Sequence, residues 1–239
     1  DCNPGLKLIA NYAVGYNNID VDAAIERSIP VTNTPGVLDD STADLTWALL
    51  MAVARRIVEA DGYMRTGKYD GWAPTLLMGT DVHHKTLGII GLGRIGFALA
   101  QRAQGFGMHI IYSDLEPKPY AAEVNAEYID MYTLLRKSDF VSLHPFYDKK
   151  SHHLIDEREF KQMKNSAFLI NVSRGPVVNE KALVKALKAG EIAGAALDVY
   201  EHEPKMEPEL AEMDNVVIVP HIASASLETR TAMGNIAVD

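Results

Sequence analysis

Cysteine is nearly absent from the chain, and basic residues are fewer than acidic ones. The one cysteine among 239 residues, Cys2, excludes an internal disulfide framework and is typical of a reducing compartment. Only 23 Lys and Arg stand against 32 Asp and Glu, so nucleic acid and anionic membranes are poor partners. The longest apolar run, near Trp47 to Ala54, is too short to span a bilayer. We therefore expect a cytoplasmic globular protein without a nucleic-acid or membrane partner.

Two common catalytic patterns are missing as well. No G-x-S-x-G occurs, so a serine nucleophile is unsupported. The histidine pairs at 83–84 and 152–153 have neither nearby cysteine nor an H-x-x-x-H spacing, which argues against a metal site. We interpret these four histidines, with His144 and His202, as structural.

From residue 87 onward, short β-branched runs alternate with amphipathic stretches. This alternation is typical of βαβ units, and continuous apolar strands indicate a parallel sheet covered on both faces. We predict an α/β fold with a doubly wound, Rossmann-like parallel sheet. The expected strands are 87–91, 109–113, 140–144, 167–172, 193–199 and 216–220, and the expected helices are about 95–104, 130–137, 156–163 and 179–190.

The chain before residue 87 has a different organisation. Short strand candidates at 6–12 and 30–34, with a helical stretch between them, indicate a smaller unit. One long helix is predicted over 42–60, where Ser41 and Asp44 resemble a capping pair. The helix is apolar nearly all round, so we expect it to be buried between domains or subunits, and a long arm follows it.

A glycine pattern indicates a nucleotide site. Gly91, Gly93 and Gly96 form G-x-G-x-x-G between an apolar strand and a helix, and Asp114 ends the next strand. The glycines allow a tight turn, the approach of a pyrophosphate and close packing of the helix. Asp114 would accept hydrogen bonds from the ribose hydroxyls of NAD and repel the 2′-phosphate of NADP. The alternative is an unliganded glycine turn with a solvated Asp114. We predict NAD(H), contacted by Gly91, Gly93, Arg94, Ile95, Gly96 and Asp114.

Three residues of distinct chemistry follow later strands: Arg174, Glu203 and His221. The carboxyl ends of parallel strands share one edge, so convergence is plausible. Arginine binds a carboxylate and polarises an adjacent carbonyl, histidine delivers a proton, and a glutamate behind the imidazole favours its charged form. For each residue alone, a solvated or satisfied strand end remains the simpler alternative.

Four motifs occur in order: "GLGRIG", "NVSRGPVVNEKAL", "LDVYEHEP" and "PHIASAS". From about residue 6 to its end, the chain resembles the D-2-hydroxyacid dehydrogenase family, and most of all its glyoxylate and hydroxypyruvate reductase branch. The resemblance implies that Arg174, Glu203 and His221 form the catalytic triad and that Asp198 contacts the nicotinamide amide. It also implies that the substrate carboxylate binds Arg174 and the backbone near Val14 and Gly15.

The same resemblance implies a domain plan. We expect a partial substrate domain at 1–36, an NAD-binding domain at 37–222 and a return segment to the substrate domain at 223–239. Family members are longer at each end, so the flavodoxin-like substrate domain is expected to be truncated. A homodimer is implied through helix 42–60 and the arm. The stretch 144–148 departs from the family, because Pro145 comes one place early.

The resulting hypothesis is NADH-dependent reduction of a small 2-oxoacid, glyoxylate or hydroxypyruvate, to the D-2-hydroxyacid. Two alternatives stay open. One is a non-catalytic, NAD(H)-sensing interaction protein on the same fold, which need not keep His221. The other is a phosphoglycerate dehydrogenase.

Overall fold

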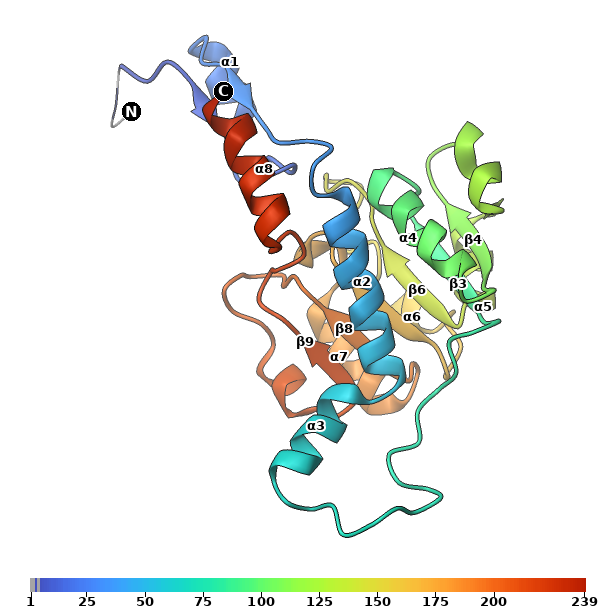
Figure 1. Ribbon diagram of the computed structural model, residues 1–239. Coiled ribbons are helices and arrows are strands. Elements are labelled where there is room, and N and C mark those ends of the chain that lie inside the picture. Colours follow the sequence, from blue (N-terminus) through green and yellow to red (C-terminus); the bar gives the residue numbers. More distant parts are fainter. Residues whose placement is uncertain (1–2, 4) are drawn as a thin grey trace. The chain divides into compact units, whose positions relative to one another are not determined.

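The computed structural model describes residue 3 and residues 5–239, so Cys2 lies outside the described part. The chain divides into two compact units (Figure 1). The smaller unit comprises the residues up to Ser41 together with Ser224–Asp239, and the larger comprises Thr42–Ala223. The expected boundaries, after residues 36 and 222, differ slightly from these. Each unit is described by itself.

The larger unit is built on a seven-stranded sheet in the order β5-β4-β3-β6-β7-β8-β9, with every pair parallel. This confirms the predicted doubly wound fold. The expected strands all occur, shortened at one or both ends in most cases, and β5 is an addition. The strands are β3 (Thr86–Ile90), β4 (His109–Ser113), β5 (Glu127–Tyr128), β6 (Phe140–Leu143), β7 (Phe168–Asn171), β8 (Gly194–Leu197) and β9 (Val216–Ile218).

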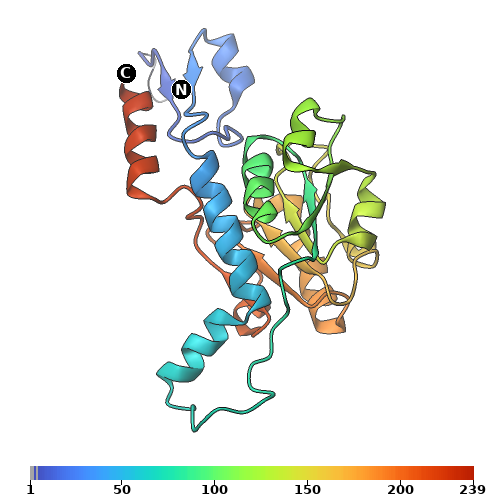
Figure 2. The ribbon, with the colours of Figure 1, turned by 45° about the vertical axis from the view of Figure 1, so that its right-hand side comes forward.

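Helices cover both faces of this sheet, which explains why its strands are apolar at successive positions (Figures 1 and 2). In β4, Ile110 and Tyr112 join the core under two helices, while Ile111 between them joins the core on the other face. The first face carries α2 (Asp39–Ala54) and α4 (Arg94–Gln104), and the second carries α5 (Met131–Lys137), α6 (Glu157–Phe160) and α7 (Glu180–Ala189).

The predicted single helix over 42–60 is wrong. Helix α2 begins at Asp39 and ends at Ala54, and a separate helix, α3, spans Ile57–Arg65. Arg56 between them has φ of 54°, a left-handed conformation that no α-helix continues through. Its guanidinium holds Glu59 of α3 through bonds of 2.7 and 2.8 Å. Residues 68–85 after α3 contain neither helix nor strand, as expected for an arm.

Among its described residues, the smaller unit has two short parallel strands and two helices. Strands β1 (Ile9–Ala10) and β2 (Val31–Thr32) pair in parallel, and α1 (Val21–Glu26) connects them. Helix α8 (Leu227–Val238) lies in the predicted return segment, and Ser226 caps it by accepting from the Thr229 N–H. The Tyr12 hydroxyl donates to the backbone carbonyl of Arg230, which ties α8 to the first residues of this unit.

Three 3₁₀ helices complete the larger unit. They are η1 (Pro119–Val124), η2 (Gly175–Val177) and η3 (Pro208–Glu212), and none was predicted. Each has proline within its first two positions, where the missing N–H has no partner to lose. Of the three, η2 positions the site, because it starts directly after Arg174.

Candidate active site

The carboxyl ends of the parallel strands gather the predicted site residues of the larger unit on one edge of the sheet. Gly91 follows β3, Asp114 follows β4, and His221 comes three residues after β9. The chain runs from β3 to β4 on one side and later to β6 on the other side of β3. The boundary between β3 and β6 is therefore the switch point, where open α/β sheets bind their ligands.

The glycine-rich turn is shaped by close backbone contacts. Gly91 has φ of 92°, and a Cβ there would lie 2.7 Å from the carbonyl of His144. A Cβ on Gly96 would lie 2.4 Å from the Gly91 oxygen. At Gly93, in contrast, a Cβ would meet nothing within 4 Å. The protein's own packing thus requires the first and third glycines, and the second leaves open space beside the helix.

The amino end of α4 fits an anion. Asp130 and Asn179 cap α5 and α7 with their side chains, but Gly93 stands at the N-cap of α4, and no side chain caps that helix. The helix is 11 residues long and begins with Arg94 and Ile95. Its first N–H groups and its dipole favour a negative group, so the turn fits the pyrophosphate of a dinucleotide.

Asp114 is tied to this turn. Its Oδ2 accepts the Leu92 N–H at 3.0 Å, and its Oδ1 accepts the Leu115 N–H at 2.7 Å. The Nζ of Lys118 lies 3.4 Å from Oδ1. The carboxylate therefore sits beside the glycine-rich turn, at the position where a ribose ligand is expected, while ribose binding itself stays a prediction.

His144 lies against the same turn. Burial lowers its pKa to about 3, so the imidazole is neutral at physiological pH. Its Nε2 lies 2.8 Å from the Ser142 hydroxyl. In the unusual stretch that follows, the Ser151 hydroxyl accepts the Asp148 N–H and donates to the Phe146 carbonyl, at 2.8 and 2.9 Å. The departure from the family is thus an ordered turn.

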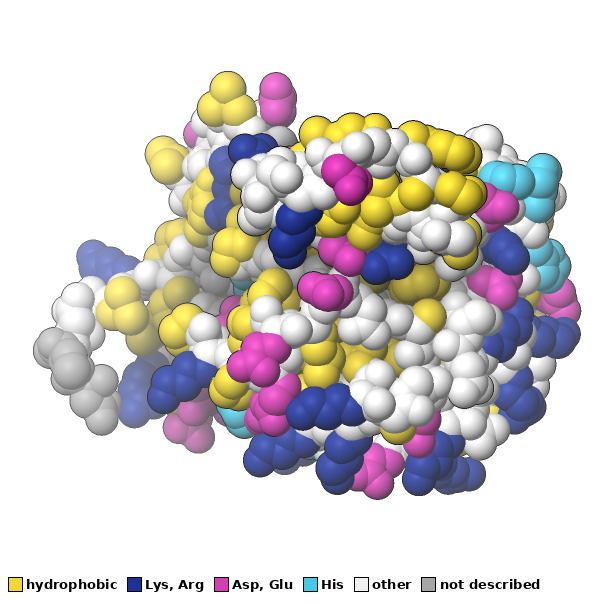
Figure 3. Space-filling model, turned by 90° about the horizontal axis from the view of Figure 1, so that it is seen from below, with side chains coloured by type: hydrophobic (Ala, Val, Ile, Leu, Met, Phe, Trp, Pro, Cys, Tyr) yellow, Lys and Arg dark blue, Asp and Glu magenta, His cyan; other side chains and the backbone are white. Residues whose placement is uncertain are grey.

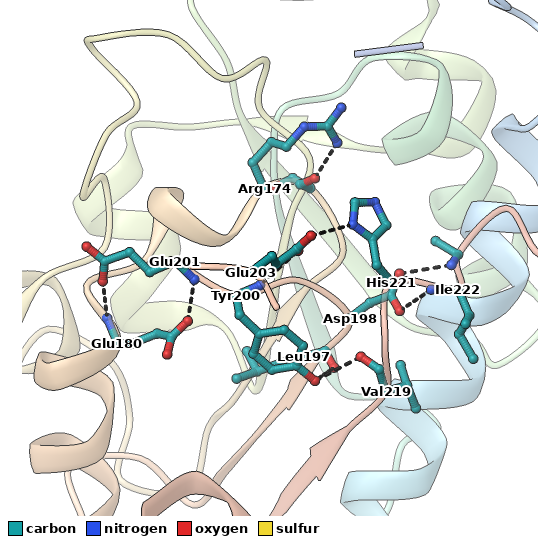
Figure 4. A network of polar contacts seen from close by, with 12 residues as sticks. Arg174, Glu180, Leu197, Asp198, Tyr200, Glu201, Glu203, Val219, His221 and Ile222 are labelled. Carbon is teal, nitrogen blue, oxygen red and sulfur yellow. Dashed lines mark hydrogen bonds and ion pairs between the residues drawn. The ribbon is translucent and has the colours of Figure 1, made fainter. Parts of the chain in front are cut away.

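Glu203 and His221 are in direct contact. The imidazole Nδ1 lies 2.9 Å from Glu203 Oε2, and Glu203 Oε1 accepts the Tyr200 N–H at 3.1 Å (Figure 4). The side chains are 36% and 50% exposed for Glu203 and His221, so the pair is open to a small molecule. A carboxylate on Nδ1 holds the ring and leaves Nε2 for proton transfer.

Arg174 belongs to the same group of charges. Its Nη1 donates to the Ser173 carbonyl at 2.7 Å, and its own carbonyl accepts from the Asn171 side chain at 3.1 Å. Burial lowers its pKa from the ordinary value, while the charge of Glu203 acts in the opposite direction. Figure 4 shows the guanidinium on the side of the network toward which the imidazole projects. The structure therefore brings Arg174, Glu203 and His221 into one region.

Asp198 has a structural role that the sequence did not reveal. Its fully buried carboxylate accepts the N–H groups of Ile222 and Ala223 at 2.6 and 2.9 Å, and its carbonyl accepts the His221 N–H. Burial raises its pKa against these hydrogen bonds. The aspartate thus fixes the turn in which His221 adopts φ of 53°. Its contact to the nicotinamide amide stays a prediction.

Several other residues of this region were not predicted. The Tyr200 hydroxyl donates to the Val219 carbonyl at 2.8 Å, and burial raises its pKa to about 12, so it remains a donor. Glu180, Glu201 and His153 form a hydrogen-bond network at residues 199–207, the loop that carries Glu203 (the Glu203 loop). Their contacts join segments 21 to 48 residues apart, and no periodic pattern signals such contacts.

Val14 and Gly15 lie in the smaller unit. The side-chain amides of Asn33 and Asn11 donate to their carbonyls, each at 2.9 Å. The carbonyl oxygens of Val14 and Gly15 therefore hold this loop in place. This arrangement is compatible with anion binding by the N–H groups of the same loop. Their contact with a substrate carboxylate stays a prediction.

Neither a metal cluster nor a membrane helix occurs in the described part of the chain. Across residue 3 and residues 5–239, no three His, Cys, Asp or Glu side chains are grouped so that they could hold a metal ion. Within the same residues, no helix has both the length and the hydropathy to cross a membrane.

Comparisons with known proteins agree with this geometry. Residues 47–223 match the family model described as D-isomer specific 2-hydroxyacid dehydrogenase, NAD binding domain. The chain is 56% identical over 238 residues to a glyoxylate reductase of Thermococcus litoralis, a match that covers 98% of this chain and 72% of that protein.

Solved structures show the same similarity. A glyoxylate reductase from Paecilomyes thermophila superposes with a TM-score of 0.91 at 37% identity, covering 98% of this chain and 71% of that one. An NADPH-dependent glyoxylate/hydroxypyruvate reductase from Sinorhizobium meliloti, in complex with NADP and malonate, gives 0.92 at 36% identity, covering 99% and 74%.

Proposed function

Because the chain belongs to the D-isomer specific 2-hydroxyacid dehydrogenase family, we propose that it reduces a small 2-oxoacid to the D-2-hydroxyacid with NADH. The family makes it an NAD-dependent oxidoreductase, and the substrate and the residue roles are our proposal. The observation that carries it is the 2.9 Å contact between His221 Nδ1 and Glu203 Oε2 at the edge of the sheet that holds the glycine-rich turn.

Each residue of the triad has one task in this reaction. The bound nicotinamide supplies the hydride that the carbonyl carbon accepts. Arg174 holds the substrate carboxylate with its planar fork and draws electron density from the adjacent carbonyl. His221, oriented through Nδ1, transfers the proton from Nε2 to the carbonyl oxygen that becomes the hydroxyl. Glu203 stabilises the imidazolium before that transfer.

Glyoxylate or hydroxypyruvate is the proposed substrate. The three similar proteins described above all carry glyoxylate in their names, and one of them also carries hydroxypyruvate. A small acid suits recognition by Arg174 and by the N–H groups near Val14 and Gly15. Phosphoglycerate is the alternative substrate. A phosphate would require further basic groups, and no feature of the described site specifically favours it.

NADH is the proposed cofactor in preference to NADPH, and Asp114 is the reason. Its carboxylate repels a 2′-phosphate, although the similar reductase from S. meliloti is NADPH-dependent. Initial rates with each cofactor at equal concentration test this proposal. Replacing Asp114 by Ser should raise the rate with NADPH relative to NADH, because it removes the repulsion and leaves Lys118 nearby. Equal rates in the unmodified protein would contradict the assignment.

A homodimer is also proposed. Figure 3 views the molecule from below, the side on which α3 and the arm lie in Figure 1, and shows hydrophobic side chains gathered among charged ones. The exposed apolar side chains of α3 and the arm are Ile57, Val58, Met64, Tyr69, Trp72 and Met78. Such a cluster is typical of an interface between subunits. The cytoplasmic location stays a prediction.

The alternative is a protein that binds NADH to regulate a partner. The contact between Glu203 and His221 favours the enzyme, since a sensor has no need of a positioned proton donor. The test follows NADH absorbance with glyoxylate, hydroxypyruvate, pyruvate and 3-phosphohydroxypyruvate. We expect rapid oxidation with the first two. NADH binding without oxidation by any of the four would favour the sensor.

A further inference from the structure

We infer that Glu180 is a positioning residue for the catalytic pair, because it anchors the loop 199–207 that carries Glu203. The inference rests on the proposed roles of Glu203 and His221. Glu180 is the first residue of α7, and it is only 4% exposed. A buried carboxylate is costly unless it is hydrogen-bonded, so its partners indicate what it does.

Both oxygens of Glu180 accept backbone N–H groups of the loop. Oε1 accepts the N–H of Glu201, two residues before Glu203 (Figure 4). Oε2 accepts the N–H of Glu207, four residues after Glu203, at 2.8 Å. The carboxylate thus fixes the loop on either side of Glu203. Hydrogen bonds from N–H groups to a carboxylate are stronger than those to a neutral acceptor, which suits an anchor.

Glu201 also bonds back to Glu180 and extends the network to residues 172–179, the connection between β7 and α7 that carries Arg174 (the Arg174 loop). Its Oε2 accepts the Glu180 N–H at 3.3 Å, and its Oε1 lies 2.7 Å from His153 Nε2. The His153 N–H in turn donates to the Pro176 carbonyl at 2.8 Å. Burial opposes the ionisation of Glu201, but the bonds from His153 and Glu180 outweigh it, and its pKa lies below the ordinary value. The network therefore links the Glu203 loop with the Arg174 loop.

The two loops also touch directly. A Cβ on Gly175, next to Arg174, would lie 1.8 Å from the Tyr200 carbonyl oxygen and 2.5 Å from the Glu201 nitrogen. Only glycine permits this approach. A shift of the Glu203 loop thus moves the backbone against which the Arg174 loop rests.

Glu203 depends on this support because it has little of its own. It is half-exposed, and besides His221 it accepts the N–H of Tyr200 in its own loop. In Glu180→Gln, the amide NH₂ would face one of the two loop N–H groups, so one anchor is lost. The loop then relaxes, and the contact between Glu203 and His221 is less populated.

The experiment compares Glu180→Gln, Glu203→Gln and the double variant of the full chain in glyoxylate reduction. We expect Glu180→Gln to lower kcat about tenfold with little change in the KM for NADH, since the proton donor is affected and the glycine-rich turn is not. The alkaline fall of kcat/KM should begin at lower pH. In the Glu203→Gln background, Glu180→Gln should have little further effect.

The pH at which kcat/KM falls on the alkaline side depends on the few charged groups around His221. Glu203 contacts the imidazole, the charge of Asp198 acts on His221, and Arg174 lies within the field of Glu203. Glu180→Gln leaves all three unchanged in sequence. A shift of the alkaline limb therefore reports the position of Glu203.

A matched control is Asp139→Asn. Asp139 accepts the Thr86 N–H at 2.9 Å and pairs with Lys164 at 2.8 Å, but it precedes β6, at the amino edge of the sheet. The Asp139→Asn substitution should lower thermal stability without changing the pH at which kcat/KM falls on the alkaline side. If Glu180→Gln does not fold, His153→Gln removes the partner of Glu201 at a more exposed position, and a smaller shift in the same direction is expected.

The outcomes separate the two proposals. No effect of Glu203→Gln on kcat would overturn the proposed function, whatever Glu180 does. A clear effect of Glu203→Gln, together with an equal loss from Glu180→Gln in both backgrounds, would overturn only the positioning role. The positioning role would also be wrong if neither Glu180→Gln nor His153→Gln changed the pH at which kcat/KM falls on the alkaline side.

Discussion

At the residue scale, Gly93 is a position where a substitution can weaken ligand binding without destabilising the fold. Its backbone is extended and has room for a Cβ. Gly93→Ala should therefore leave the free energy of unfolding within about 0.5 kcal/mol of its original value. The added methyl lies where a pyrophosphate is expected, so the Kd for NADH should rise at least about tenfold. Chemical denaturation and fluorescence titration with NADH measure the two effects.

Gly62→Ala is the control for this substitution. A Cβ on Gly62 would also meet nothing within 4 Å, but this glycine lies within α3, away from the turn. Alanine should stabilise that helix by about 0.5–1 kcal/mol and leave NADH binding unchanged. If Gly93→Ala bound NADH as tightly as Gly62→Ala, the assignment of the phosphates to this turn would be wrong.

His221 and Arg174 are expected to fail in different ways. His221→Ala removes the proton donor, so kcat should fall by about 10²–10⁴ with an unchanged Kd for NADH. Arg174→Lys keeps a charge but loses the bidentate fork, so the KM for the oxoacid should rise more than kcat falls. Steady-state kinetics distinguish the two patterns. The same pattern in both variants would contradict the separate tasks.

At the scale of elements, the sequence predicts what local patterns encode. The runs that became β3 through β9, β5 excepted, are apolar at most positions because both faces of the sheet are covered. The break between α2 and α3 was missed because apolar residues resume directly after it at Ile57 and Val58, and because Arg56 adopts a left-handed conformation without being glycine. Strand β5 has only two residues, too few for a period to be visible.

The same reasoning explains which parts of the site were found. Arg174, Glu203 and His221 stand near strand ends, so parallel topology alone makes their convergence plausible. The partners of Asp198 and Glu180 are backbone N–H groups of distant loops. Every residue except proline has such a group, so these contacts leave no mark on residue type. A buried acid at a helix start, as at Glu180, resembles an ordinary favourable helix terminus.

The network beneath the loops should make stability depend on pH. Folding lowers the pKa of Glu201, so its contribution is fully present above the ordinary carboxyl pKa and is lost as pH falls through the lowered value. At pH 7, Glu201→Gln should cost about 1–3 kcal/mol of unfolding free energy, because bonds to a charged group are lost. The cost should shrink by pH 3. Urea unfolding at both pH values checks this, and an equal cost at each would contradict the ionised assignment.

At the scale of the whole molecule, the proposed homodimer predicts that the exposed apolar side chains of α3 and the arm lie in the interface between subunits. Trp72 is 81% exposed, which is unusual for so large a side chain. Trp72→Asp should shift the chain toward monomer in light scattering coupled to size exclusion, since a charge would be buried in the interface. Leu115→Asp is the control, because Leu115 is 96% exposed at the end of β4. A dimer unaffected by Trp72→Asp would place the interface elsewhere.

The contact at Gly175 sets a rule for building chimeras of this protein and its relatives. The segment around residue 175 and the segment around residue 200 meet backbone to backbone, with no side chain between them to adjust. Recombination with a crossover from 176 to 199 would join segments of different parentage at that contact. Chimeras that inherit both segments from one parent should retain activity more often, and a shuffled library would show this linkage as a gap in its tolerated crossovers.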